Sequence, residues 1–143
     1  MCACVNLVKE SEMQRSSINP VSWSVNLGFD QAELIEGHRR LLVCSGQDAV
    51  DAEGNSQHPG DMAAQLEMSL DNLEAVLAAA DMTLADVVRL NVYTTDFDEF
   101  VKHWATIAGR FGESEGRFAT TLLGVTRLFT PQLLVLLEAT AVD

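Results

Sequence analysis

The sequence predicts an α+β domain in which two helices cover one face of a β-sheet. Residues 62–80 and residues 97–112 carry apolar side chains at spacings of three and four, which is the period of an amphipathic helix. Residues 87–94 alternate apolar and polar side chains, as a strand with one wetter face does. Residues 120–141 hold two runs rich in leucine and valine around Pro131. With two short runs before the first helix, the predicted order is strand, strand, helix, strand, helix, strand, strand.

The length and charge of the chain limit what it can be. With 143 residues and 48% hydrophobic content, it fits one domain with a sizeable core. Residues 1–19 are polar and are expected to be flexible and irregular, so the ordered domain is expected over residues 20–143. The net charge of −12 repels phosphate groups, so we expect neither nucleic acid nor a membrane surface as a partner. No run resembles a membrane span or a signal peptide, which predicts a cytoplasmic protein.

The cysteine and histidine pattern predicts neither a disulfide framework nor a metal site. The cysteines are odd in number and lack framework spacing, as expected in a reducing compartment: Cys2, Cys4 and Cys44. Cys2 and Cys4 have no cysteine or histidine near them in sequence to complete a tetrahedral zinc site. The three histidines also lack the spacings of zinc enzymes.

Local signals mark where the individual elements begin. Residues 31–37 and 40–45 are expected to be short strands, and the second run, LLVCS, is apolar enough for a central strand. Residues 23–28 carry no clear signal. Asp61 is expected to cap the first helix. The spacing of Thr83 with Asp86 predicts a capped turn before the middle strand.

Asp96 and Glu99 have the spacing of a capping box, which predicts that the second helix begins after Asp96. Residues 122–128 and 133–141 are then expected to pair as an antiparallel hairpin, because strand-sized apolar runs flank turn residues. The chain has no third amphipathic helix to cover the second face of the sheet, so we expect a homo-oligomer.

Several motifs in a fixed order resemble the Rid family of reactive intermediate deaminases, also called the YjgF family. They are LLVCSGQ, GDMAAQLEMSLDNLEAVLAAADMTLADVVRLNVYTTDFDEF, ATTLLGVTRL and LLVLLEATAV, and the similarity extends from about Gly28 to the C-terminus. The resemblance implies a chorismate-mutase-like fold, β-β-α-β-α-β-β, with a mixed sheet that lines a homotrimeric barrel. It also implies small-molecule clefts between subunits. Active members hydrolyse imines and enamines to 2-oxo acids and ammonia without a metal or cofactor.

The chain departs from the family at positions that serve the substrate in active members. Thr120 stands where the P-A-R-S motif has the arginine that grips the substrate carboxylate. Leu136 stands where V-E-I-E-A has the glutamate that positions water, and Glu138 matches the second glutamate. Phe29 replaces a tyrosine and Trp104 an asparagine. The resemblance therefore implies a cleft for a more apolar substrate that lacks a carboxylate.

Each candidate residue also has an ordinary structural alternative. Trp104 and Phe29 serve either the core or the cleft. Arg117 either replaces the missing guanidinium or is a solvated side chain. Thr120 and Thr121 are either ordinary strand residues or hydroxyl donors to a ligand.

Cys44, Ser45 and Gly46 are consecutive residues at the end of the second predicted strand. Cys44 is expected to be a buried, inert thiol rather than a nucleophile, because no cation is evident beside it. Ser45 either contacts the ligand or hydrogen-bonds the backbone. Gly46 is expected to let a ligand approach main-chain N–H groups.

Two functions from different classes remain open. The first is an enzyme of Rid type that acts on a reactive imine, enamine or related molecule, with Thr120 and Glu138 orienting water. The second is a noncatalytic trimer that binds a small apolar metabolite or a partner protein, with Glu138 paired to Arg89 or Arg127. A ribonuclease, a label that some family members carry, fits poorly with a net charge of −12.

Overall fold

The structure is a computed structural model that describes residues 12–114 and 116–143, so Cys2 and Cys4 lie outside the described residues. The strands are β1 Gln14–Ile18, β2 Ala32–Glu36, β3 Leu41–Val43, β4 Gln47–Asp48, β5 Val87–Thr94, β6 Ala119–Gly124 and β7 Val135–Val142. The helices are α1 Trp23–Asn26, α2 Met62–Ala79, α3 Phe97–Val101 and α4 Trp104–Glu113, and η1 Leu84–Asp86 is a 3-10 helix.

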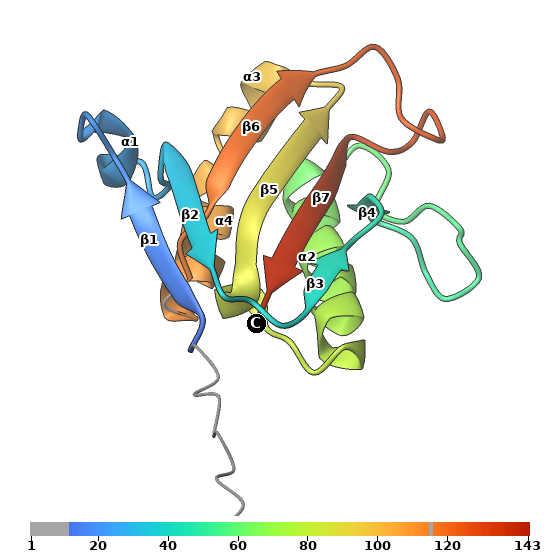
Figure 1. Cartoon of the computed structure of the whole chain (residues 1–143). Helices are drawn as coiled ribbons and strands as arrows, with labels where there is room; N and C mark the ends of the chain where they lie inside the picture. The colour runs from blue at the N-terminus through green and yellow to red at the C-terminus, as the bar shows by residue number, and fades with distance from the viewer. Residues whose placement is uncertain (1–11, 115) are drawn as a thin grey trace, which may run out of the picture.

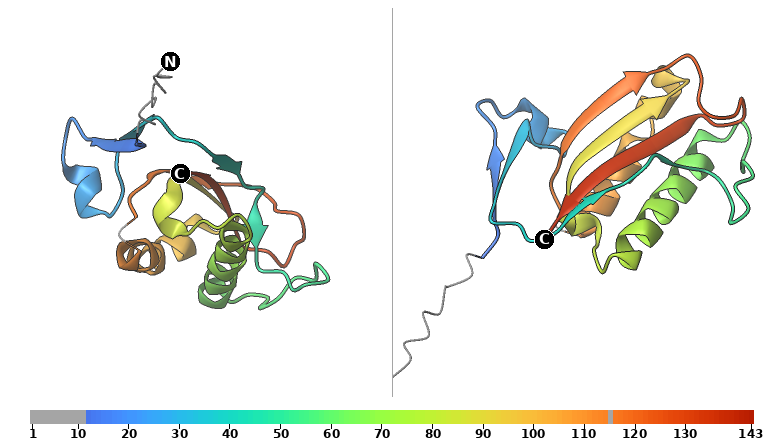
Figure 2. Two further views of the ribbon diagram at one scale, coloured as in Figure 1. Left: turned by 60° about the horizontal axis from the view of Figure 1, so that its bottom comes forward. Right: turned by 45° about the vertical axis from the view of Figure 1, so that its right-hand side comes forward.

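One mixed sheet forms the centre of the molecule, and β1 and β2 form a separate antiparallel hairpin beside it (Figure 1). The sheet has the order β3-β7-β5-β6, with β4 also pairing to β7. Only β5 and β6 run parallel, and the other pairs are antiparallel. Helices α2 and α4 lie on the same side of this sheet (Figure 2). The predicted α+β class, with both main helices on one face, is confirmed.

Helix α2 forms as predicted because its start is capped and its apolar residues share one stripe. The Asp61 carboxylate accepts a hydrogen bond of 3.0 Å from the Ala64 N–H, which satisfies an otherwise free donor of the first turn. The stripe residues Leu66, Leu70 and Leu73 are fully buried in the core. Burying a leucine side chain stabilises a fold by roughly 1.5–3 kcal/mol, so this stripe fixes α2 on the sheet.

The expected terminal hairpin is wrong. Strand β5 lies between β6 and β7: Leu90 pairs with Thr120 on one side and with Ala139 on the other. The crossover through α3 and α4 makes β6 parallel to β5, and the connection after β6 then passes over the end of β5. Thr94, the last residue of β5, bonds to both ends of this connection. Its carbonyl accepts a hydrogen bond from Val125 N (2.8 Å), and its hydroxyl donates one to Leu134 O (2.7 Å).

The expectation that the chain is irregular up to Asn19 is wrong for β1. This strand is polar, yet it pairs along its whole length with β2. Arg15 fastens it to the main body by donating to the carbonyls of Ala85 (2.7 Å) and Val87 (2.8 Å). Hydrogen bonds to another element, rather than burial of apolar side chains, account for its order.

Two further elements differ from the prediction. Strand β3 is at the edge of the sheet, not at its centre, and Val43 is 72% exposed. The expected second helix is divided into α3 and α4 at Lys102 and His103. At this point the His103 N–H bonds to Phe100 O (2.9 Å), which is the tighter spacing of a 3-10 turn.

The side of the sheet that faces away from α2 and α4 is called the open face here. Side chains alternate along β7, so Leu137 is buried on the helix side whereas Leu136 and Glu138 point to the open face. Apolar side chains are exposed on this face, including Leu41 and Val43 on β3 and Leu123 on β6. This agrees with the predicted alternation in the last strand.

Candidate functional site

A pocket of about 380 Å³ opens between β6, the end of α3 with the start of α4, and the segment before β2. It is lined by Leu27, Phe29, Val101, Trp104, Thr120 and Leu122. Three of these were predicted site residues: Phe29, Trp104 and Thr120. The lining contains one hydroxyl and the indole of Trp104 as its polar side-chain groups, and it contains no charged side chain.

Trp104 serves the core and the pocket at once. Its ring is 6.2 Å from the Phe29 ring and 6.3 Å from the Phe100 ring, in edge-to-face arrangements. Its Nε1–H donates a 2.8 Å hydrogen bond to the carbonyl of Leu27. This bond holds the chain before β2 over the start of α4, so Trp104 positions Leu27 and Phe29 as pocket walls.

The Thr120 hydroxyl is engaged by the backbone. It donates to the carbonyl of Leu90 at 2.6 Å, which leaves only its lone pairs for a ligand. Thr120 pairs with Leu90, a buried residue on the helix side, whereas Glu138 pairs with Asn91 on the open face. Thr120 and Glu138 therefore lie on opposite faces of the sheet, and they cannot contact the same small molecule within one chain.

Glu138 belongs to a polar group on the open face. One carboxylate oxygen accepts from Asn91 Nδ2 (3.1 Å) and from the Tyr93 hydroxyl (3.2 Å). Neither of the alternative pairings of Glu138, with Arg89 or with Arg127, occurs among the ion pairs of the described residues, and Arg89 donates instead to the Thr121 hydroxyl (3.2 Å). Burial and the negative charge of Glu138 raise the pKa of Tyr93, so this phenol stays protonated and donates its hydrogen bond.

Ser45, Gly46 and Leu136 are close together but lie apart from the pocket. A Cβ atom on Gly46 would lie 2.6 Å from both terminal methyl groups of Leu136. The Leu136 side chain therefore fills the space beside Gly46 within the chain, where a ligand was expected to approach the main chain. Ser45 is exposed, and its hydroxyl donates no hydrogen bond within residues 12–114 and 116–143. Burial raises the pKa of the Cys44 thiol, which agrees with an inert cysteine.

The contact between Gly46 and Leu136 predicts a coupled pair of substitutions. Gly46→Ala alone is expected to destabilise the protein by about 1–3 kcal/mol, because the added methyl overlaps the leucine. In the double variant with Leu136→Ala the overlap disappears, so the two effects should be non-additive by about 1 kcal/mol or more. Urea unfolding of the wild type, both single variants and the double variant measures this coupling. Strict additivity would show that the two residues do not press on each other.

Arg117 is not available to the pocket. It forms an ion pair with Asp30, whose side chain is fully buried. Arg117 therefore fits neither expectation. Its guanidinium does not line the pocket in place of the missing arginine, and it is not simply solvated because it pairs with Asp30. Among the pocket residues, Leu27, Val101 and Leu122 were not predicted. The spacing in the sequence could have indicated two of them. Leu122 shares a strand face with Thr120, and Val101 lies three residues before Trp104, on the same side of the predicted second helix.

The part of the chain that the structure describes contains neither a metal-binding cluster nor a membrane-spanning helix. Within residues 12–114 and 116–143, no group of three or more histidine, cysteine, aspartate or glutamate side chains is arranged to hold a metal ion. No helix in the same residues is both long and apolar enough to cross a bilayer.

Comparison with known proteins relates the chain to one family. The sequence profile described as endoribonuclease L-PSP matches residues 29–143. The chain is 30% identical over 119 residues to the 2-iminobutanoate/2-iminopropanoate deaminase of Escherichia coli (strain K12), which covers 82% of this chain and 84% of that protein.

Solved structures give the same relationship. A Yersinia pestis protein of unknown function from the conserved Rid family, YyfB, superposes with a TM-score of 0.79 at 36% identity, covering 90% of this chain and 98% of that one. The YjgF gene product of Escherichia coli superposes with a TM-score of 0.64 at 32% identity, covering 80% and 87%. The chain belongs to the Rid family, also known as the YjgF family.

Proposed function

We propose that the chain binds a small, uncharged and largely apolar molecule in the pocket formed by Phe29, Trp104 and Thr120, and that a reactive imine or enamine without a carboxylate is its substrate. The observation that carries this proposal is the lining, which has no charged side chain. A carboxylate brought into such a site would lose its hydration without gaining a partner. The Escherichia coli relative is named for 2-imino acids, which carry a carboxylate.

The proposed site is completed by other copies of the chain. The open face exposes Leu41 (58%), Val43 (72%) and Leu123 (48%) around the polar group of Glu138. Apolar strand surface of this kind is normally covered, and further copies of the same chain can cover it in a symmetric assembly. The resemblance to the Rid family implies three copies, so we propose a homotrimer, with Leu136 and Ser45 of one subunit facing the pocket of the next.

The test compares two substrates that differ only in the carboxylate. An amine oxidase produces an imine from phenylethylamine, and an amino-acid oxidase produces the matching 2-imino acid from phenylalanine. We expect the protein to accelerate ammonia release from the first and not from the second. Faster release from the 2-imino acid than from the neutral imine would overturn the proposed preference.

Thr120→Arg should reverse this preference. The guanidinium would enter the pocket and give a carboxylate a two-pronged donor, and each charged hydrogen bond contributes roughly 1.5–3 kcal/mol. Ammonia release from the phenylalanine imino acid should therefore rise by about tenfold or more over the wild type. Thr120→Lys is the matched control, because it adds the charge without the planar fork, and should give a smaller gain. Equal rates for wild type and Thr120→Arg would show that the pocket does not receive the substrate.

A noncatalytic binding protein is the second candidate. Its supporting observation is that no acid or base lines the pocket of the chain and that Glu138 lies on the opposite face of the sheet. This candidate predicts saturable binding of a neutral aromatic molecule with no acceleration of ammonia release from any imine. The net charge of −12 argues against ribonuclease activity in this member of the family.

A further inference from the structure

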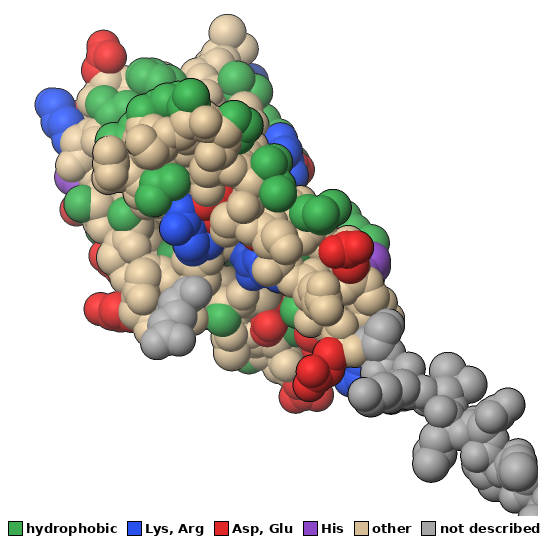
Figure 3. Space-filling view, turned by 60° about the vertical axis from the view of Figure 1, so that its left-hand side comes forward, with side chains coloured by type: hydrophobic (Ala, Val, Ile, Leu, Met, Phe, Trp, Pro, Cys, Tyr) green, Lys and Arg blue, Asp and Glu red, His purple; other side chains and the backbone are tan. Residues whose placement is uncertain are grey.

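The loop of residues 19–31 forms one side of the pocket. Its two ends lie side by side and are called its neck, and a buried carboxylate holds them together. It connects β1 to β2, contains α1, and carries Leu27 and Phe29 into the pocket lining. The family profile begins at residue 29, so Leu27 and α1 lie outside the matched part of the chain. Leu27 is 52% exposed. Figure 3 shows that hydrophobic side chains gather at the upper end of one face of the molecule.

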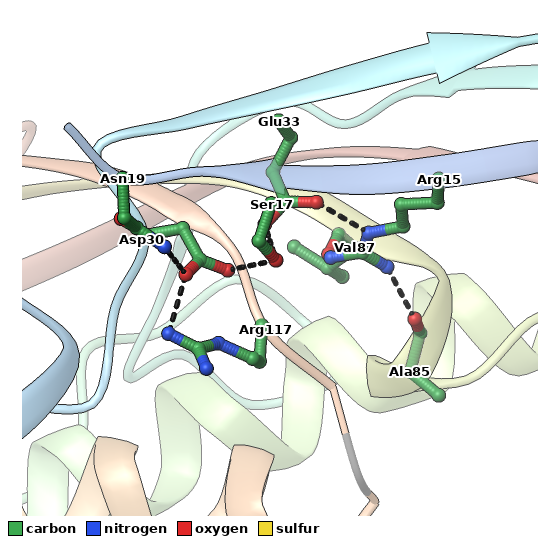
Figure 4. Close-up of polar contacts among 8 residues, drawn as sticks. All are labelled: Arg15, Ser17, Asn19, Asp30, Glu33, Ala85, Val87 and Arg117. Carbon is green, nitrogen blue, oxygen red and sulfur yellow. Dashed lines mark hydrogen bonds and ion pairs between the residues drawn. The ribbon is translucent and has the colours of Figure 1, made fainter.

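Asp30 makes the neck of this loop. Its carboxylate accepts hydrogen bonds from Ser17 Oγ (2.8 Å) and Asn19 Nδ2 (2.6 Å) and pairs with Arg117 (Figure 4). Asn19 closes the same neck from the other side, because its Oδ1 accepts from Gln31 N (2.8 Å). Asp30 is 1% exposed, and a buried carboxylate persists only when such partners compensate its charge.

The backbone of Asp30 is also bonded to the start of β6, the strand that carries the pocket residue Thr120. Its N–H donates to the carbonyl of Phe118 at 2.9 Å, and it forms a parallel bridge with Ala119. Ala119 and Asp30 are the immediate neighbours of Thr120 and Phe29, which are pocket walls on β6 and on the loop. A displacement of Asp30 must therefore change the distance between these two walls.

A second buried carboxyl group, Glu33, lies next to Asp30. Glu33 accepts from Arg15 Nε at 2.8 Å, and the Ser17 hydroxyl lies between it and Asp30 (Figure 4). The charged groups that face the pair are Arg15 on β1 and Arg117 before β6. The carboxylate of Asp86, on the adjacent η1, is turned to the Thr83 N–H instead.

We propose that Asp30 and Glu33 are positioning residues that hold the 19–31 loop against the pocket, and that a proton held by the pair tightens this hold. The inference rests on the proposed binding role of the pocket. When Glu33 is protonated, it can donate a hydrogen bond to Asp30 and relieve the repulsion between two buried carboxylates. When both are ionised, the pair repels and the neck of the loop loosens.

The electrostatics of the cluster support a change near neutral pH. Burial and the hydrogen bond with Asp30 raise the pKa of Glu33 to about 7, although Arg15 opposes the shift. Burial acts to raise the pKa of Asp30 too, but hydrogen bonds with Glu33, Asn19 and Ser17 and the charge of Arg117 hold it below its ordinary value. Glu33 is therefore the member that gains and loses the proton.

The test uses a neutral fluorescent probe, N-phenyl-1-naphthylamine, because its own charge does not change between pH 6 and pH 8. With a pKa of about 7, the protonated fraction of Glu33 falls from roughly nine-tenths to one-tenth over this range. Affinity scales with the competent fraction, so wild-type affinity should fall by about five- to tenfold from pH 6 to pH 8. Glu33→Gln keeps a neutral donor and should bind equally well at both pH values.

Two further variants separate positioning from general damage. Asp30→Asn should bind about tenfold more weakly than wild type at both pH values, because the loop loses the ion pair at its neck. Asp143→Asn, which breaks the exposed pair with Arg40, should bind as the wild type does. A Glu33→Gln protein with the same pH dependence as the wild type would refute the proposal.

Amide hydrogen exchange tests the same loop without a ligand. After correction for the intrinsic effect of pH, amides of residues 22–31 should exchange faster at pH 8 than at pH 6 in the wild type but not in Glu33→Gln. Amides of α4 serve as the internal reference. Failure of the wild type to bind the probe, with this exchange pattern intact, would reject the binding role and leave the positioning role standing. Equal loop protection at both pH values would reject the proposed tightening by a proton on the pair, whatever the probe shows.

Discussion

Trp104→Ala is expected to lower the free energy of unfolding by about 3 kcal/mol and to abolish binding in the pocket. The indole contacts the rings of Phe29 and Phe100, and a tilted contact joins it to Phe118 at 6.5 Å between ring centres. Removing it opens the pocket into a larger cavity and releases the carbonyl of Leu27. Urea unfolding gives the stability, and titration with N-phenyl-1-naphthylamine gives the affinity.

Trp104→Phe is the matched control. It retains an aromatic ring but removes the N–H that bonds to Leu27, and a single neutral hydrogen bond contributes about 1 kcal/mol. This variant should therefore lose about a third as much stability as Trp104→Ala and should bind the probe with reduced affinity. If Trp104→Ala still bound the probe as tightly as the wild type, the pocket would not be the binding site.

Val43→Glu is expected to convert the proposed trimer into single subunits. Val43 is 72% exposed in the isolated chain and lies at the open edge of the sheet, where the proposed assembly would bury it. Burying an unpaired carboxylate at each of three symmetric contacts opposes association by several kcal/mol per site. Light scattering after gel filtration should give three times 15.6 kDa for the wild type and 15.6 kDa for the variant.

Ala75→Glu provides the control for charge. Ala75 is exposed on α2, on the side of the sheet away from the open face. The same added carboxylate at this position should leave the mass unchanged. A wild-type mass of 15.6 kDa would show that the open face is not covered by copies of the chain.

Elements whose signals are local were predicted well from the sequence. Helix α2 and strand β5 begin and end within a residue of the expected positions, because caps and periodicity act over a few residues. The capping box of Thr83 and Asp86 also formed as expected. These features depend on neighbouring residues only, so the sequence contains what is needed to specify them.

Strand partners were predicted poorly because they depend on distant segments. Nothing in residues 122–141 indicates that β5 separates β6 from β7, since either neighbour would satisfy the same alternation. Strand β1 was missed because its order depends on β2 and on the hydrogen bonds of Arg15. Both errors concern long-range pairing rather than the type of element.

The candidate site was predicted in part. The resemblance brought Phe29, Trp104 and Thr120 together, and the structure places them in one pocket. It also paired Thr120 with Glu138, which the alternation of β5 places on opposite faces. A motif aligned along the chain does not show which face of a sheet each residue occupies once a middle strand intervenes.

The aromatic cluster around Phe29 gives the molecule an intrinsic optical signal. Trp23 and Trp104 are the two tryptophans of the chain, and their rings lie 5.8 Å and 6.2 Å from the Phe29 ring. One is carried by the short helix α1 and the other begins α4. Ultraviolet emission excited at the indole band therefore originates entirely from two rings that pack against Phe29, a wall of the proposed binding pocket. A ligand that enters the proposed pocket is therefore expected to change this emission, so unlabelled protein can be used to follow binding without a background from tryptophans elsewhere.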